Sequence, residues 1–231
     1  MHLCGRIDLT MKDFVIIVAA GSGSRMKTAI PKQFLELSGK PILQHTIEKF
    51  HRFNPNMSII VVLNDEYITF WRDLMRTLKM DIPHEIIPGG AQRFYSVKNA
   101  IQSIQESEGI VGIHDAVRPL VSLKTIENCY SAARIKLTAV PVISLNDSIR
   151  IVQGTQSEMA DRSKFRIVQT PQCFELSLLK KAFDQPYEEA FTDDASVVER
   201  YGYPVHLVEG NRENLKVTTA EDLRMAEALL L

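Results

Sequence analysis

The chain has 231 residues, of which 45% are hydrophobic and 24% are charged, with a formal net charge of -1, as expected of a globular protein of one domain. The balanced charge argues against a general binder of nucleic acid or of membrane surfaces, because such proteins carry a basic excess. The three cysteines are odd in number and far apart in the sequence, which argues against a disulfide framework or a zinc site and favours the cytoplasm.

The first ten residues, MHLCGRIDLT, are too short and too mixed for a signal peptide. Met11 comes just before the first strand-like segment. We therefore interpret residues 1–10 as an N-terminal extension and residues 11–231 as a single domain. No apolar run approaches the ~20 residues of a membrane-spanning helix.

Strand-like and helix-like segments then alternate along the chain. Continuous apolar runs rich in β-branched residues predict strands, and apolar residues at helical spacing predict the helices between them. The predicted strands cover residues 14–20, 57–63, 85–87, 109–119 and 138–145. The predicted helices cover residues 41–53, 66–78 and 91–105, with a further helix capped by Ser122.

Residues 146–168 interrupt this rhythm with a polar, alternating pattern, which predicts a β-arm that projects from the sheet. Helices near 174–183 and 193–201, a strand at 204–210 and a last helix follow, and Thr219 and Asp222 predict a capping box for the last helix. The whole pattern predicts a three-layer α/β/α, Rossmann-like fold with a mainly parallel, twisted sheet. In the helix at 66–78, Phe70, Leu74 and Leu78 share one stripe, which we assign to the core.

The loop after the first strand carries the first functional signal, AAGSGSRMKTAIPKQFL (19–35). A glycine-rich loop at the carboxyl end of a strand is typical of phosphate binding. The third glycine of the dinucleotide fingerprint and the Walker A pattern are both absent, while Arg25, Lys27 and Lys32 lie close to the glycines. Cations at this place suit a triphosphate on which negative charge grows during reaction, although a tight turn between a strand and a helix is the plain alternative.

Five further motifs occur in order along the chain: PGGAQRFYSV (88–97), HDAVRP (114–119), DRSKFRIVQTPQCF (161–174), TDDAS (192–196) and VEGNRENLKVTTAEDL (208–223). Together with the glycine loop they resemble the sugar-nucleotide cytidylyltransferases, most closely the cytidylyltransferase family of the non-mevalonate isoprenoid pathway. The resemblance implies transfer of CMP from CTP to 2-C-methyl-D-erythritol 4-phosphate. In that reaction the sugar phosphate attacks the α-phosphate in line and pyrophosphate leaves.

The resemblance also implies roles for individual residues. Arg25, Lys32, Arg162 and Lys216 would be catalytic, and Asp115 would help to hold Mg²⁺ and the sugar. Arg118, Ser148 and Thr192 would contact the sugar phosphate. The binding site for CTP would be formed by Ala19, Ala20, Gly21, Ser22, Gly23, Gly90, Ser96 and Ala116. Members of the family are homodimers joined through the arm, so Arg162 would reach the substrate of a partner subunit.

Some of these residues have a simpler structural interpretation. His114 suits a buried, hydrogen-bonded histidine better than a catalyst, and Thr192 is also a good N-cap for a helix starting at Asp193. The chain departs from the family at Ala91, where many members carry an acidic residue, and at Ser148, where a threonine is expected.

Three other functions remain open from the sequence. A ribitol 5-phosphate cytidylyltransferase would share the chemistry and most of the motifs, and the acceptor depends on a few contacts to a small polyol. A non-catalytic nucleotide-binding protein would not need the cations of the glycine loop. A nicotinamide-dependent oxidoreductase is disfavoured by the glycine spacing and by the lack of a carboxylate at a strand end about 20 residues downstream.

Overall fold

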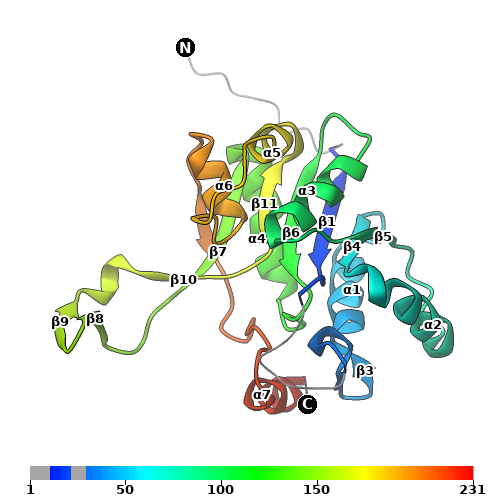
Figure 1. The fold of residues 1–231 in the computed structure, drawn as a ribbon, viewed down its shortest axis with the longest axis horizontal. Helices are drawn as coiled ribbons and strands as arrows, with labels where there is room; N and C mark the ends of the chain where they lie inside the picture. Colours follow the sequence, from blue (N-terminus) through cyan, green and yellow to red (C-terminus); the bar gives the residue numbers. More distant parts are fainter. Residues whose placement is uncertain (1–10, 22–29, 231) are drawn as a thin grey trace.

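The computed structural model describes residues 11–21 and 30–230. The predicted N-terminal extension and the centre of the glycine loop, with Ser22, Gly23, Arg25 and Lys27, lie outside these ranges. The described chain forms a three-layer α/β structure around a twisted sheet (Figure 1). The predicted fold class is confirmed.

The central sheet has the strand order β10-β7-β11-β6-β1-β4-β5, and β12 pairs with β7. The strands β1, β4, β5 and β6 are parallel neighbours, and β12 is parallel to β7, whereas β10 and β11 pair in the antiparallel direction. The sheet strands are β1 (Asp13–Val18), β4 (Ser58–Leu63), β5 (Glu85–Pro88), β6 (Ile110–Asp115), β7 (Thr138–Ser144), β10 (Arg166–Val168), β11 (Gln172–Glu175) and β12 (Leu207–Glu209).

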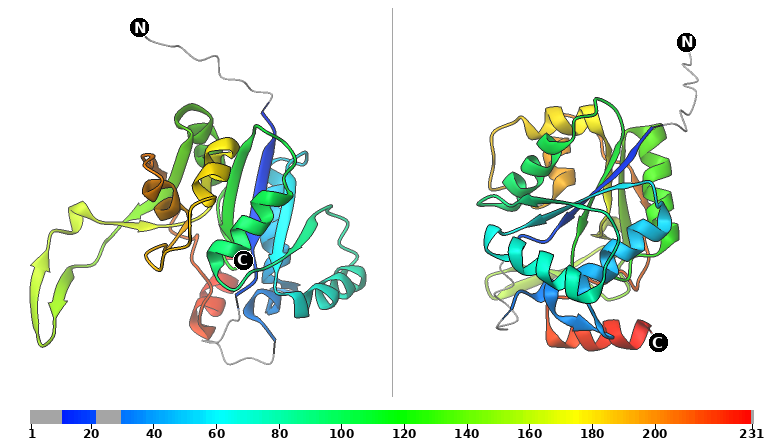
Figure 2. Two further views of the ribbon diagram at one scale, coloured as in Figure 1. Left: turned by 45° about the horizontal axis from the view of Figure 1, so that its top comes forward. Right: turned by 90° about the vertical axis from the view of Figure 1, so that its right-hand side faces the viewer.

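Helices cover both faces of the sheet, as the view along its edge shows (Figure 2). The larger apolar cluster on one face includes α3, α5 and α6, and the cluster on the other face includes α1, α2 and α4. This is why β1, β4 and β6 are apolar on both faces. The helices are α1 (Ile42–Phe53), α2 (Ile68–Leu78), α3 (Arg93–Ser103), α4 (Leu123–Lys136), α5 (Leu176–Phe183), α6 (Asp194–Arg200) and α7 (Ala220–Leu230).

Short elements complete the structure around the carboxyl edge of the sheet. The 3-10 turn η2 (Lys32–Phe34) follows the glycine loop, and η3 (Asp65–Tyr67) follows β4. The small hairpin of β2 (Glu36–Leu37) and β3 (Lys40–Pro41) packs with α7 in a third apolar cluster, which includes Leu37, Val117, Val217 and Ala226.

The projecting segment is a two-stranded hairpin of β8 (Ile149–Gln153) and β9 (Gln156–Ala160), which extends far from the sheet (Figure 1). The turn η4 (Arg162–Lys164) follows it. The predicted arm extends too far at its carboxyl end, because residues 166–168 form β10, which pairs with β7 in the main sheet.

Three details differ from the sequence analysis. The strand β11 lies between β6 and β7, and its last two residues fall where the sequence predicted the start of the helix near 174–183, because a strand of four residues is too short for a periodic signal. Phe70 is 40% exposed, and the buried residue of α2 is its neighbour Trp71, so the assigned core stripe is wrong at Phe70. The N-cap of α6 is Asp193 and not Thr192, since the Asp193 side chain accepts the backbone N–H of Ser196.

The other two predicted caps are confirmed. The Ser122 hydroxyl accepts the backbone N–H of Thr125 at the start of α4. At the start of α7 the Asp222 carboxylate accepts the N–H of Thr219, and the Thr219 hydroxyl accepts the N–H of Asp222.

Candidate active site

A cleft of about 610 Å³ lies at the carboxyl edge of β1, β4, β5 and β6. This is the edge where ligands bind in open α/β sheets. The cleft is lined by Val18, Ala19, Ala20, Gly21, Lys32, Gln33, Asn64, Gly89, Gly90, Ala91, Gln92, Arg93, Ser96, Asp115, Ala116, Val117 and Lys216.

Backbone hydrogen bonds carry the sheet ladder past the strand ends and hold the loops of the cleft together. Ala19 N–H donates to Val62 O at 2.8 Å, and Gly89 N–H donates to Leu63 O at 2.7 Å. Ala116 N–H donates to Val18 O at 3.1 Å. The side chain of Gln33 adds a bond of 2.6 Å from Nε2 to Ala19 O, which fixes the turn that carries Lys32 against the end of β1.

Close packing explains the two glycines of the Pro88-Gly89-Gly90 motif. A Cβ on Gly89 would lie 2.6 Å from the Ala20 Cβ, and a Cβ on Gly90 would lie 2.4 Å from the Tyr95 Cβ. The two glycines therefore allow the loop after β5 to approach the loop after β1. The buried Ser96 hydroxyl accepts the Gly90 N–H at 3.0 Å and so sets the conformation of this loop.

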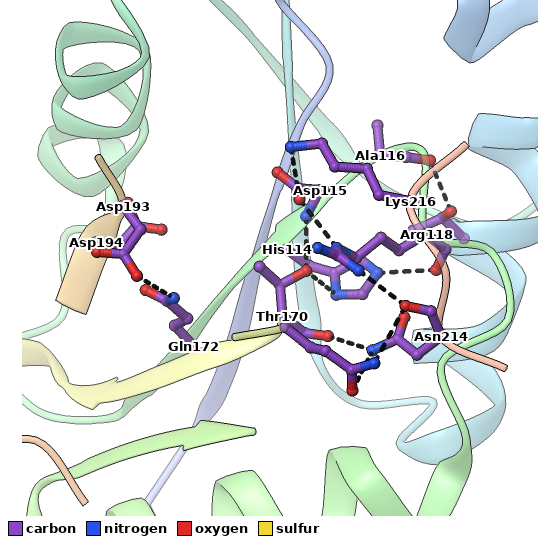
Figure 3. A network of polar contacts seen from close by, with 12 residues as sticks. His114, Asp115, Ala116, Arg118, Thr170, Gln172, Asp193, Asp194, Asn214 and Lys216 are labelled. Carbon is purple, nitrogen blue, oxygen red and sulfur yellow. Dashed lines mark hydrogen bonds and ion pairs between the residues drawn. The ribbon is translucent and has the colours of Figure 1, made fainter. Parts of the chain in front are cut away.

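Asp115, the last residue of β6, is the acidic centre of the cleft. Its Oδ2 accepts hydrogen bonds from Arg118 Nε and Lys216 Nζ, each at 3.1 Å (Figure 3). Burial alone would raise the pKa of Asp115. The charges of Lys216, Arg93 and Arg118 outweigh burial and hold this pKa well below its ordinary value. Asp115 is therefore an ionised carboxylate inside a group of cations.

Lys216 comes to Asp115 from a distant part of the sequence. Val217 N–H donates to Val117 O at 2.9 Å, and the side chains of both valines are buried in the third apolar cluster. The position of Lys216 therefore depends on how residues 215–217 pack against Val117 in the third apolar cluster. The sequence around Lys216 does not by itself determine this position.

His114 lies below Asp115 and is fully buried. Its Nε2 is 3.1 Å from Arg118 O, an acceptor, so Nε2 carries the proton. Nδ1 then accepts the Thr170 hydroxyl at 3.0 Å, and Thr170 Oγ1 accepts the Asp115 backbone N–H at 3.1 Å (Figure 3). Burial lowers the pKa of His114 to about 4, so the ring is neutral and satisfied. The interpretation of His114 as a structural histidine agrees with this geometry.

The structure brings most of the predicted site residues together. Those that line the cleft are Ala19, Ala20, Gly21, Lys32, Gly90, Ser96, Asp115, Ala116 and Lys216. Arg118 lies beside them. Its Nε donates to Asp115 Oδ2 at 3.1 Å and its Nη1 donates to Asn214 O at 2.8 Å, so the guanidinium orients Asp115 and the backbone at Asn214.

Besides Arg118, three predicted residues do not line this cleft. Ser148 and Arg162 are exposed near the arm, where the Arg162 guanidinium donates to Asn146 O, and Thr192 is exposed just before α6. Ser22, Gly23 and Arg25 fall outside the described residues.

Sequence reasoning missed Asn64 and Arg93, which also line the cleft. Asn64 directly follows the last residue of β4. It is a polar residue at a strand end, as Asp115 is at the end of β6. Arg93 follows the glycines of a strand-end loop by three residues, which resembles the placement of Arg25 after Gly23. The same signal could have found it.

The described residues contain no group of three or more histidine, cysteine or carboxylate side chains that could hold a metal ion by themselves. No helix among these residues has both the length and the apolar character needed to cross a membrane.

Comparison with known proteins identifies the family. The model of the IspD family, described as 2-C-methyl-D-erythritol 4-phosphate cytidylyltransferase, matches residues 14–231. The chain belongs to this family. The 2-C-methyl-D-erythritol 4-phosphate cytidylyltransferase of Phocaeicola vulgatus is 49% identical over 220 residues, covering 95% of this chain and 100% of the relative. The enzyme of the same name from Bacillus velezensis is 39% identical, covering 95% and 96% of the two chains.

Solved structures of IspD proteins have the same fold. The crystal structure of 2-C-methyl-D-erythritol 4-phosphate cytidylyltransferase from Thermus thermophilus aligns with a TM-score of 0.77 at 30% identity, covering 95% of this chain and 98% of that chain. The enzyme of Francisella tularensis aligns with a TM-score of 0.78 at 32% identity, covering 94% and 99%. Both alignments cover at least 94% of this chain, and the resemblance to this family that the motifs indicated is confirmed.

Proposed function

We propose that the protein transfers CMP from CTP to 2-C-methyl-D-erythritol 4-phosphate and releases pyrophosphate, as the names of its relatives say of them. The observation that carries this proposal is the convergence of Lys32, Lys216 and Asp115 with two glycine loops in one cleft. Backbone amides and cations around a single carboxylate suit a nucleoside triphosphate and a reaction in which charge grows on phosphate. Because the family model and the relatives are named for methylerythritol phosphate, ribitol phosphate is not favoured as the acceptor.

In this proposal the loops after β1 and β5 bind CTP. Ala19, Ala20 and Gly21 present backbone groups from one side of the cleft, and Gly90 and Ser96 do so from the other. Ala116 closes the floor, since the buried Thr46 hydroxyl donates to Ala116 O at 2.8 Å and fixes that turn. Ser22 and Gly23, which lie outside the described residues, would also contact CTP, as the resemblance implies.

The phosphoryl chemistry needs no protein nucleophile, because the acceptor's phosphate oxygen attacks the α-phosphorus directly. Lys32 and Lys216 would stabilise the negative charge on the phosphorus centre, and Arg25 would add a third cation. Arg118 would act through Asp115, whose carboxylate it holds at 3.1 Å. The ionised Asp115 is a hard oxygen ligand that fits Mg²⁺ if the triphosphate supplies the remaining oxygens, and Mg²⁺ would there neutralise charge on the leaving pyrophosphate.

The β-hairpin arm would join two copies of the chain in a homodimer. It exposes Ile151 (44%), Val152 (69%) and Met159 (79%). A two-stranded hairpin is marginally stable by itself in water, so these side chains favour a partner surface. Ser148 and Arg162 would then act on the acceptor in the partner's cleft, and Thr192 would do so within its own subunit. Cys129 and Cys173 are buried free thiols, which suits a cytoplasmic protein.

The test is release of pyrophosphate by the purified protein with CTP and Mg²⁺, with methylerythritol 4-phosphate and ribitol 5-phosphate in parallel reactions. Turnover with the first acceptor alone is expected. Turnover only with ribitol 5-phosphate would show that ribitol 5-phosphate is the acceptor. No turnover with either acceptor would favour a non-catalytic nucleotide-binding protein.

A further inference from the structure

A bidentate ion pair joins the first turns of two helices beside the cleft. Arg93, the first residue of α3, donates from Nη1 to Asp194 Oδ1 at 2.7 Å and from Nη2 to Asp194 Oδ2 at 2.6 Å. Asp194 is the first residue of α6, and its side chain is 1% exposed, whereas that of Arg93 is 33% exposed. A fork of two parallel bonds fixes the orientation of both groups as well as their distance.

The two helix starts belong to different sides of the site. The start of α3, with Gln92, Arg93 and Ser96, lines the cleft next to the glycines after β5. The start of α6 directly follows Thr192, which the sequence predicted to contact the acceptor. The ion pair therefore spans the nucleotide side and the acceptor side of the site that we propose.

The α6 end of the pair is held rigidly. Gln172 donates from Nε2 to Asp193 Oδ2 at 2.8 Å (Figure 3). Its Oε1 accepts the Ala195 N–H at 2.8 Å. Gln172 is on β11, two residues after Thr170, which accepts the backbone N–H of Asp115. The position of Asp194 is thus tied to the strand that supports Asp115.

The charges explain why this pair has to remain formed. A buried carboxylate without its partner is strongly unfavourable, so Asp194 keeps the guanidinium at the wall of the cleft. The positive charge of Arg93 also acts on Asp115, because it contributes to lowering the pKa of that carboxyl. Without Asp194 the guanidinium would be drawn toward Asp115, where Lys216 already donates.

We propose that Asp194 is a positioning residue for cytidylyl transfer, and that its fork with Arg93 sets the nucleotide-binding loop at 88–96 relative to the acceptor-side segment at 192–194. This inference rests on the proposed function. It assigns one role to two residues that lie 101 positions apart in the sequence. A displacement of about 1 Å between reacting groups is enough to lower turnover by about 100-fold.

The test uses full-length protein with CTP, methylerythritol 4-phosphate and Mg²⁺. The variants are Arg93→Lys, which keeps the charge and loses the fork, Asp194→Asn, and the two combined. The control is Arg200→Lys, because Arg200 on the same helix makes an exposed pair with Glu188 at 2.9 Å and its side chain is 61% exposed. Each variant is measured for kcat at saturating substrates, for the Kd of CTP by calorimetry, and for the melting temperature.

We expect Arg93→Lys and Asp194→Asn each to lower kcat by about 10- to 100-fold while the Kd of CTP rises much less, because the backbone contacts to the nucleotide remain. The combined variant should be no slower than the slower single variant, since both changes break one unit. Arg200→Lys should match the wild type. If Asp194→Asn does not fold, Arg93→Lys decides the question, because its one-third exposed side chain keeps a charge beside Asp194.

A folded Arg93→Lys with kcat within about twofold of the wild type, and only a lower melting temperature, would show a purely structural pair and overturn the inference. Equal loss of kcat in Arg200→Lys would overturn it too. Absence of turnover in the wild type would instead overturn the proposed function, and the inference with it.

Discussion

Replacing Lys216 by methionine separates catalysis from stability. Methionine keeps most of the length of the side chain and removes the charge that lies 3.1 Å from Asp115. The Lys216 side chain is 42% exposed, so water screens the pair, and such pairs contribute about 0.2–1 kcal/mol to the free energy of unfolding. Asp115 also keeps its bond to Arg118 and is not left without a cation. The expected loss of stability is therefore below about 1 kcal/mol, or about 2–4 °C in melting temperature.

The expected loss of activity is much larger. Removal of one group that stabilises charge in a transition state lowers kcat by about 10²- to 10³-fold, which corresponds to about 3–4 kcal/mol. The assay is pyrophosphate release at saturating CTP and acceptor, with a thermal melt of the same sample. The control is Lys124→Met, because Lys124 pairs with Glu127 at 2.9 Å on the surface of α4 and should change neither quantity. A folded Lys216→Met protein with kcat within about fivefold of the wild type would refute the catalytic role.

Three further predictions concern pH, packing and assembly. The pKa of His114 is about 4 in the fold, below its ordinary 6.5, so the unfolded chain binds the proton first. Stability should therefore fall as the pH drops from about 6.5 to about 4; melts of wild type and His114→Gln test this, and an equal pH dependence of both would contradict it. Gly112→Ala would place a Cβ 2.4 Å from the Tyr130 hydroxyl and should cost about 1–3 kcal/mol in urea unfolding; an unchanged midpoint would speak against that contact. Val152→Glu with Met159→Glu should turn a dimer into a monomer in sedimentation velocity, and the arm is not the interface if both proteins sediment alike.

Much of the fold was open to prediction because it depends on local patterns. The runs in β1, β4 and β6 are apolar at consecutive positions, which a strand covered on both faces requires. The caps at Ser122 and at Thr219 with Asp222 depend on side chains within three residues of the bonds they make, so their sequence signal is complete. The placement of the strand-end loops at one edge then follows from the parallel topology.

The weaker predictions fail for equally local reasons. In β11 only four residues are extended, and their partners in β6 and β7 are more than thirty residues away, so no window of the sequence contains the signal. Phe70 and Trp71 are adjacent aromatic residues, and helical spacing alone could not decide which one faces the core. Packing decides it, since Trp71 stacks on Phe34 and donates its indole N–H to His84 Nε2 at 3.0 Å.

For the site, the sequence determined which side chains are available, and the tertiary structure decided which of them meet. The glycine loop and the motif around Asp115 each predict a phosphate site, because backbone amides and charges at strand ends are local features. The contacts of Asp115 with Lys216 and of Arg93 with Asp194 join segments about 100 residues apart. They form only because β6, the third apolar cluster and α6 are packed in one structure, and it is this packing that gathers the charges into one cleft.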